Sequence, residues 1–320
     1  MTQPSASTPT RGADDRAVDP LRLEVVPVRH PGRWVAVAVI AVFAAMLVHS
    51  LITNARWEWS YVQGYFTYPA IMSGIVVTLE LTVLAMVIGV SLGIIVAIMR
   101  LSANPIVAGG AWLYTWFFRG TPVLVQLIFW AYVGALYPRF SIGIPFGPAF
   151  ASASANTLVS TFTAVVLGLG LNEGAYMSEI VRAGLLSVDQ GQTEAAHALG
   201  MGRMLTLRRI ILPQAMRIIV PPTGNETISM LKTTSLAAYV GLYDLLGASA
   251  SIYGGNLKYV PLLVVASSWY LLMTSVLSAV QFYIERYYAR GAARALPPTP
   301  LQRLRLRLRL RPRDASGEGR

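Results

Sequence analysis

Six long apolar stretches separate shorter polar segments along this 320-residue chain. A stretch of about twenty apolar residues with few charges is typical of a helix that crosses a bilayer. The fifth stretch contains Pro221, Pro222 and Gly224, so we expect a broken helix there. The pattern predicts an all-α membrane protein with six transmembrane helices. The predicted spans are residues 34–53, 70–99, 121–138, 156–180, 211–231 and 260–284.

Composition supports the same class and excludes several kinds of chemistry. Charged residues make up 13% of the chain, whereas soluble domains are about one quarter charged. The chain has no cysteine, so a disulfide framework, thiol catalysis and thiolate metal sites are excluded. Its three histidines are scattered, so we expect no metal site in this chain.

Basic residues gather on one side of the six predicted spans. The other side receives only Arg56, Arg139 and Lys258. Because the more basic side of a membrane protein is usually cytoplasmic, we expect a multi-pass protein of the plasma (inner) membrane with both termini inside. The basic side holds the arginines of segments 11–33, 100–119, 182–209 and 286–320.

Residues 187–213 form the most distinctive polar segment. Ser187 and Gln190 are spaced as a capping box, which predicts a helix over 188–199. Gly200 ends that helix, and a second helix rich in arginine follows. We therefore expect a helix–turn–helix elbow that its charges hold on the cytoplasmic side.

The spacing inside this elbow resembles the cytoplasmic loop of ABC importer permeases, where an EAA triplet precedes glycine, isoleucine and Leu-Pro at fixed distances. The resemblance covers about residues 70–285 and implies the five-helix core of a type I importer permease. Residues 34–53 would then be an extra N-terminal transmembrane helix. The matching positions are Glu194-Ala195-Ala196, Gly200, Ile210 and Leu212-Pro213, and the flanks resemble the polar amino-acid permeases at Phe118-Arg119-Gly120-Thr121-Pro122, Gly174-Ala175-Tyr176, Gly224-Asn225 and Lys232-Thr233-Thr234-Ser235-Leu236.

This resemblance implies the permease subunit of an ATP-driven importer, which translocates a polar amino acid delivered by an extracytoplasmic binding protein. It implies that Glu194, Ala195, Ala196, Gly200 and Arg203 contact ATP-binding cassette ATPase subunits. A second permease would complete the transporter, either as a homodimer or as a sister chain. The chain lacks the Gly-Lys pair of a phosphate-binding loop, so ATP and Mg are expected on the partner ATPase. No cofactor and no enzymatic activity are expected in this chain.

Charged residues within the predicted spans are the candidates for substrate contact. An ionised side chain at the centre of a membrane helix costs at least about 2.5–3.5 kcal/mol, so such residues usually face the protein interior or a water-filled path. Glu226, Asn225 and Glu80 are therefore predicted to line the substrate pathway. A structural ion pair, for example with Lys232, is the competing interpretation. An ion channel or a membrane-embedded enzyme that uses Glu80 and Glu226 is the alternative function.

Charged residues near the elbow are expected to orient it rather than to touch substrate. Glu179 and Arg182 are three residues apart and can pair on one helix, close to Glu173 and Tyr176. Arg119, just before a proline that would start a helix, is expected to anchor at the cytoplasmic interface.

The two ends of the chain are predicted to be cytoplasmic tails. Residues 1–33 are proline-rich and of mixed charge, which is typical of disorder. Residues 286–320 are basic, and the repeat RLRLRLRLR at 303–311 is expected to lie on anionic lipid of the inner leaflet. Nucleic-acid binding is not expected, because the orientation rule already accounts for the net charge of +11.

Overall fold

The computed structural model describes residues 31–144 and 147–288. Most of the two predicted tails, including the Arg-Leu repeat at 303–311, lies outside the described residues. The chain divides into two compact units, which meet in the sequence at Arg56 and Trp57.

The first unit contains α1 (Pro31–Thr53), which agrees with the predicted span 34–53. Apolar side chains surround this helix on every side, as Trp34, Phe43 and Ile52 illustrate. A helix that is apolar all round is suited to hydrocarbon rather than to water.

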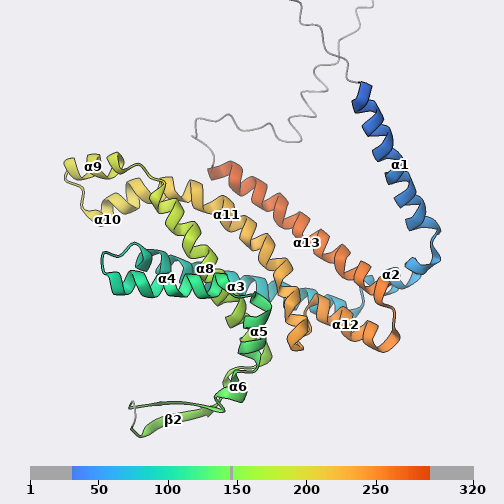
Figure 1. The fold of residues 1–320 in the computed structure, drawn as a ribbon, viewed down its shortest axis with the longest axis horizontal. Helices are drawn as coiled ribbons and strands as arrows, with labels where there is room; N and C mark the ends of the chain where they lie inside the picture. The colour runs from blue at the N-terminus through green and yellow to red at the C-terminus, as the bar shows by residue number, and fades with distance from the viewer. Residues whose placement is uncertain (1–30, 145–146, 289–320) are drawn as a thin grey trace, which may run out of the picture. The chain divides into compact units, whose positions relative to one another are not determined.

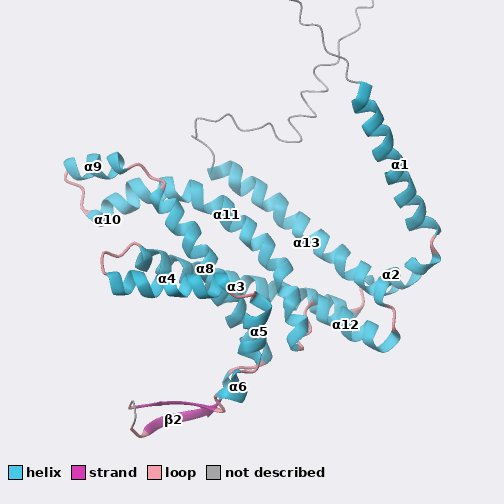
Figure 2. Cartoon of the chain, viewed as in Figure 1, coloured by secondary structure: helices cyan, strands magenta, loops and turns pink. Residues whose placement is uncertain are grey.

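The described residues of the second unit form helices, the loops that join them and one small hairpin (Figures 1 and 2). Its first half comprises η2 (Ala55–Trp57, which begins in the first unit), α2 (Trp59–Phe66), α3 (Pro69–Arg100), α4 (Pro105–Gly120), α5 (Val123–Ala131), α6 (Val133–Leu136), β1 (Arg139–Gly143), β2 (Ala149–Ser154) and α7 (Ala155–Leu158). Its second half comprises α8 (Thr161–Leu186), α9 (Gln190–Ala198), α10 (Arg203–Thr206), the π-helical turn η3 (Leu207–Ile211), α11 (Leu212–Thr233), η4 (Thr234–Val240), α12 (Leu245–Asn256) and α13 (Tyr259–Tyr288). The antiparallel pair β1–β2 was not expected from the sequence.

Three of the described helices are long and apolar enough to cross a membrane, namely Gly32–Thr53, α3 and α13. A fourth crossing would be the bent pair Arg203–Val240 and Leu245–Asn256. The helices α3 and α13 correspond to the expected spans 70–99 and 260–284. The total of six spans stays a prediction.

The third predicted span, residues 121–138, contains the short helices α5 and α6, and a further helix precedes it. That helix, α4, begins at Pro105, where the Asn104 side chain accepts a hydrogen bond from the Ile106 N–H and caps it. It then breaks between Gly120 and Val123, so α4 and α5 are two consecutive helices.

The fifth span is not broken where its prolines predicted a break. The helix α11 continues through Pro221, Pro222 and Gly224, and the chain bends only after η4, where Gly241 has a φ of 81°. On the neighbouring helix α13, Gln281 Nε2 donates to the Pro221 carbonyl oxygen at 3.0 Å. The hydrogen atom of Gly224 leaves room for that glutamine, whose side chain any Cβ at residue 224 would meet.

The helices α3 and α8 lie against each other along a row of glycines, which we call the glycine seam. Gly89 and Gly93 of α3 face Glu173 and Met177 of α8, and a Cβ at Gly93 would stand 2.5 Å from the Met177 Cβ. Gly174 of α8 similarly faces α3 and α4. Small residues allow membrane helices to approach closely, which strengthens dispersion contacts where no hydrophobic driving force acts. The seam therefore fixes α8 inside the bundle.

A charged contact joins two segments at the end of the second unit opposite the elbow. Lys258 Nζ donates to Glu58 Oε1 at 2.9 Å and lies 4.9 Å from the centre of the Tyr61 ring. The hydrogen bond to the Glu58 carboxylate raises the pKa of Lys258 above its ordinary value. The contact connects the start of α2 with the loop between α12 and α13.

Replacing a glycine of the seam should destabilise the protein. Gly93→Leu would drive a side chain into Met177, and overpacking of this kind costs about 1–3 kcal/mol. The thermal midpoint of the purified protein should fall, whereas Gly110→Leu on α4, where nothing lies within 4 Å of an added Cβ, should leave it unchanged. Equal midpoints for the two variants would contradict a tight seam.

Candidate functional site

A break in the backbone between α4 and α5 is the starting point of the candidate site. Pro122 has no N–H, so the carbonyl oxygen of Phe118, four residues earlier, loses its helical partner. Two side chains replace that partner: Asn172 Nδ2 donates to this oxygen at 2.8 Å, and Gln126 Nε2 donates at 3.0 Å. Gln126 also donates to Thr121, and its own Oε1 accepts from Asn172 at 3.2 Å. Side-chain hydrogen bonds to the freed Phe118 carbonyl thus stabilise the break.

A polar cavity of about 540 Å³ opens beside this break. Three elements wall it: the α4–α5 junction, the middle of α8 and the second half of α11. Its lining residues are Arg119, Gly120, Thr121, Pro122, Val123, Asn172, Glu173, Tyr176, Glu226, Ser229, Met230 and Thr233.

Groups of both charges face one another across this polar cavity. Glu173 is only 3% exposed, and its Oε1 has no hydrogen-bond partner within the described part of the chain. Glu226 lies on the neighbouring wall, and the Arg119 guanidinium lies 5.3 Å from the centre of the Tyr176 ring. No side chain caps the first turn of α5, so its N–H groups add a partial positive charge near Pro122 and Val123. The cavity can therefore hold a ligand that carries both an anionic and a cationic group.

An ion-pair network of three residues connects α3 with α8 at the end near the elbow. Glu179 accepts from Arg182 at 2.6 Å, which confirms the pairing expected on α8. The other oxygen of Glu179 lies 3.6 Å from Arg100, the last residue of α3. The elbow thus follows a part of α8 that is held by the neighbouring helix.

The elbow itself consists of α9, a glycine turn and α10 (Figure 1). Its expected cap is wrong: the Asp189 side chain accepts from the Gly191 N–H, whereas Ser187 donates to the Gly184 carbonyl at the end of α8. The helix accordingly begins at Gln190 rather than at 188. Gly200 has a φ of 76°, a conformation that favours glycine at a helix end.

The candidate contact residues of the elbow differ in exposure. Glu194, Ala195, Gly200 and Arg203 are exposed, whereas Ala196 is 2% exposed and packs inside the elbow. The four exposed residues are therefore accessible to another protein, whereas Ala196 is buried within the elbow.

Comparison with known proteins gives the family. Residues 89–290 match the model of the inner membrane component of binding-protein-dependent transport systems. The chain belongs to that family. It is 46% identical, over 92% of each chain, to the arginine transport system permease protein ArgU of Corynebacterium glutamicum. It is 36% identical to the L-cystine transport system permease protein TcyB of Bacillus subtilis, over 77% of this chain and 97% of TcyB.

Solved structures agree with the fold of this permease. A crystal structure of an amino acid ABC transporter with histidines contains a chain that is 35% identical, with a TM-score of 0.58. The match covers 68% of this permease and 94% of that chain. A chain of the MetNI methionine ABC transporter in an inward-facing conformation shares the fold, with a TM-score of 0.55 at 18% identity.

The permease places its predicted pathway residues in different surroundings. Glu226 lines the polar cavity, whereas Asn225 and Glu80 are exposed side chains outside its lining. Lys232 is also exposed, and no ion pair joins it to Glu226 in residues 31–144 and 147–288. The structural ion pair considered for these two residues is therefore not formed.

Three residues of the cavity were assigned elsewhere from the sequence. Arg119 is expected to anchor at the cytoplasmic interface, which stays a prediction, and in the structure it is exposed and also lines the cavity. Glu173 and Tyr176 were expected to orient the elbow, and they also line the cavity. Asn172 was not singled out, although a polar Asn-Glu pair inside an apolar run signals a buried function.

Removing the amide that supports the helix break should destabilise this permease. Asn172→Leu leaves the Phe118 carbonyl with one partner fewer and costs about 1–3 kcal/mol. The thermal midpoint should fall, and Asn172→Gln, which keeps an amide, should restore part of the loss. A midpoint unchanged in Asn172→Leu would mean that Gln126 alone supports the break.

Proposed function

We propose that this permease is the membrane subunit of an ATP-driven importer for a polar amino acid, and that the polar cavity holds the substrate during transport. The observation that carries the proposal is the presence of Glu226, Glu173 and Arg119 around one cavity beside the open N-terminus of α5. The relatives whose names state a substrate carry amino acids or their derivatives, which supports the substrate class.

An amino acid offers a partner for each of these groups. Its carboxylate is assigned to the N–H groups of the first turn of α5 and to Arg119, because helix N-termini and guanidinium groups both favour anions. Its ammonium is assigned to Glu226. Glu173 remains for a second cationic group, which suits a basic side chain such as that of arginine, the substrate named for the relative at 46% identity.

The remaining pathway residues are assigned to the route outside the cavity. Glu80 and Asn225 are exposed in the single chain. The free-energy cost of placing a charged group such as Glu80 in contact with lipid is high, so these side chains are expected to be covered by protein or to face water. We assign them to the surface shared with a second permease chain. The second chain is either another copy of this permease or a sister permease.

The elbow is assigned to the ATPase. Glu194, Ala195, Gly200 and Arg203 are its exposed candidate contacts, with Ala196 as internal support. ATP and Mg would be bound and hydrolysed by that partner, and the binding protein would deliver substrate on the opposite side. Both termini would be cytoplasmic, which reporter fusions after residues 60 (outside) and 200 (inside) would test. The channel and membrane-enzyme alternatives are not favoured, because the relatives are transport permeases.

Removing the charge of Glu226 should weaken substrate binding. Glu226→Gln keeps the shape but loses a charge-assisted hydrogen bond of about 1.5–3 kcal/mol, so the KM for uptake should rise about tenfold or more. Glu285→Gln, outside the cavity, is the matched control. Uptake of labelled amino acids and the thermal midpoint are measured on both variants. A lower midpoint with unchanged KM and substrate preference would assign Glu226 to packing and overturn its role.

Changing the turn of the elbow should uncouple the ATPase from transport. Gly200→Ala forces a side chain into the left-handed region, at a cost of about 1–2 kcal/mol, and should reduce both uptake and copurification of the ATPase. Gly202→Ala is the matched control in the same turn, because Gly202 has a φ of −69°. Glu194→Arg should have the stronger effect by reversing a contact charge. Normal uptake in Gly200→Ala and Glu194→Arg would remove the docking assignment.

A further inference from the structure

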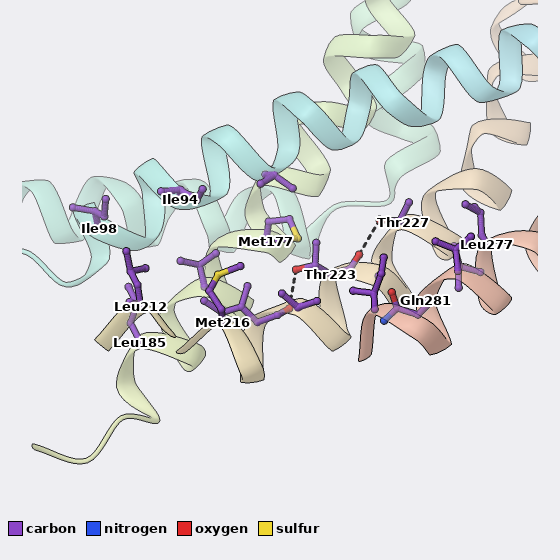
Figure 3. A pocket seen from close by; sticks show the side chains of 18 of the residues that line it. Ile94, Ile98, Met177, Leu185, Leu212, Met216, Thr223, Thr227, Leu277 and Gln281 are labelled. Carbon is purple, nitrogen blue, oxygen red and sulfur yellow. Dashed lines mark hydrogen bonds between the residues drawn. The ribbon is translucent and has the colours of Figure 1, made fainter. Parts of the chain in front are cut away.

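A second cavity, of about 650 Å³, lies between α3, α8, α11 and α13 and differs in chemistry from the polar cavity (Figure 3). Aliphatic and methionine side chains make up most of its wall, among them Ile94, Met177, Met216 and Leu277. A polar substrate would leave its charges unpaired there, so the wall suits an apolar occupant.

The few polar groups of this apolar cavity are already bonded within the protein. The Thr223 hydroxyl donates to the Ile219 carbonyl at 2.8 Å, and the Thr227 hydroxyl donates to the Thr223 carbonyl at 2.9 Å. Gln281 donates to the Pro221 carbonyl and to Glu285. No donor among these three side chains is left for a polar ligand.

The apolar cavity extends to the end of the bundle that carries the elbow. Its lining includes Ile98 and Leu185, close to the last residues of α3 and α8, and Leu212, the first residue of α11. Leu207, in the π-helical turn before α11, also lines the cavity, and we call this end of the cavity its mouth. Arg208 and Arg209 follow Leu207 directly in the sequence and are exposed.

The arginines near this mouth form no ion pair within the described residues. Arg208 and Arg209 are exposed, and no ion pair of residues 31–144 and 147–288 includes either of them. An apolar cavity with a basic mouth between membrane helices matches the two parts of an anionic phospholipid. A second copy of this chain could cover the apolar part of the cavity, but that contact alone would not supply an anionic partner for the arginines.

We propose that the apolar cavity is a site for an anionic phospholipid of the inner leaflet. An acyl chain lies among the side chains of α3, α8, α11 and α13, and the phosphate is held by Arg208 with Arg209. The charge-assisted hydrogen bonds of the guanidinium groups select an anionic headgroup over a zwitterionic one. The site is distinct from the polar cavity, with which it has no lining residue in common.

Native mass spectrometry of the purified transporter complex tests this proposal. The complex is offered equal amounts of phosphatidylglycerol and phosphatidylcholine with matched acyl chains, and the retained lipid is counted. We expect preferential retention of phosphatidylglycerol, and Arg208→Gln should lower it about fivefold. Arg139→Gln, which removes an arginine of the hairpin β1, is the charge-matched control and should have no effect.

A second variant tests the acyl-chain part of the site. Met216→Trp fills the apolar cavity and should lower retention of both lipids, whereas Ile218→Trp, on an exposed position of the same helix, should not. Equal retention of the two lipids by the unmodified complex would overturn the proposal. It would also be overturned if Arg208→Gln released the ATPase but kept the lipid, or if Met216→Trp changed only the association of permease chains.

Discussion

The close approach of α3 and α8 is the constraint on which the rest of the structure depends. In a bilayer the hydrophobic effect does not drive apolar helices together, because lipid tails are as apolar as the helices. Helix association therefore depends on close packing between complementary surfaces. Gly89 and Gly93 allow this close packing, because they have no Cβ that would clash with Glu173 and Met177 of α8. The same approach buries Glu173 against Gly89 and holds Asn172 beside the α4–α5 break. The glycine seam thus places both the charge and the support of the polar cavity.

The polar cavity lies beside a helix break whose free backbone carbonyl is hydrogen-bonded inside the protein. A helix break at membrane depth is tolerated only where its free carbonyls find partners. At Phe118 the partners are two amide side chains, from Gln126 on the following helix and Asn172 on α8. This arrangement leaves the first N–H groups of α5 open next to Arg119 and turns an interrupted span into a place for an anion.

The apolar pattern predicted the helices that follow from the length of apolar runs. It did not predict features that depend on contacts between residues far apart in the sequence. The helices α1, α3 and α13 followed from uninterrupted apolar runs, and Glu226 followed from its position within a span. The helix α4 lies between the second and third predicted spans and was not predicted. The continuation of α11 through its prolines was not predicted, and neither was the contact between Gln281 and the Pro221 carbonyl oxygen, because these two residues are sixty positions apart in the sequence. The Gly-x-x-x-Gly spacings of α3 and α8 were a readable signal of the seam.

The two cavities share α11 as a common wall. Thr223 and Thr227 face the apolar cavity, whereas Glu226 and Ser229, on another face of the same helix, line the polar one. If both proposed sites are correct, a ligand that shifts α11 from one cavity also changes the wall of the other. Binding at the two sites would then be thermodynamically linked, and the linkage would be reciprocal. The affinity for substrate would in that case depend on the composition of the surrounding bilayer.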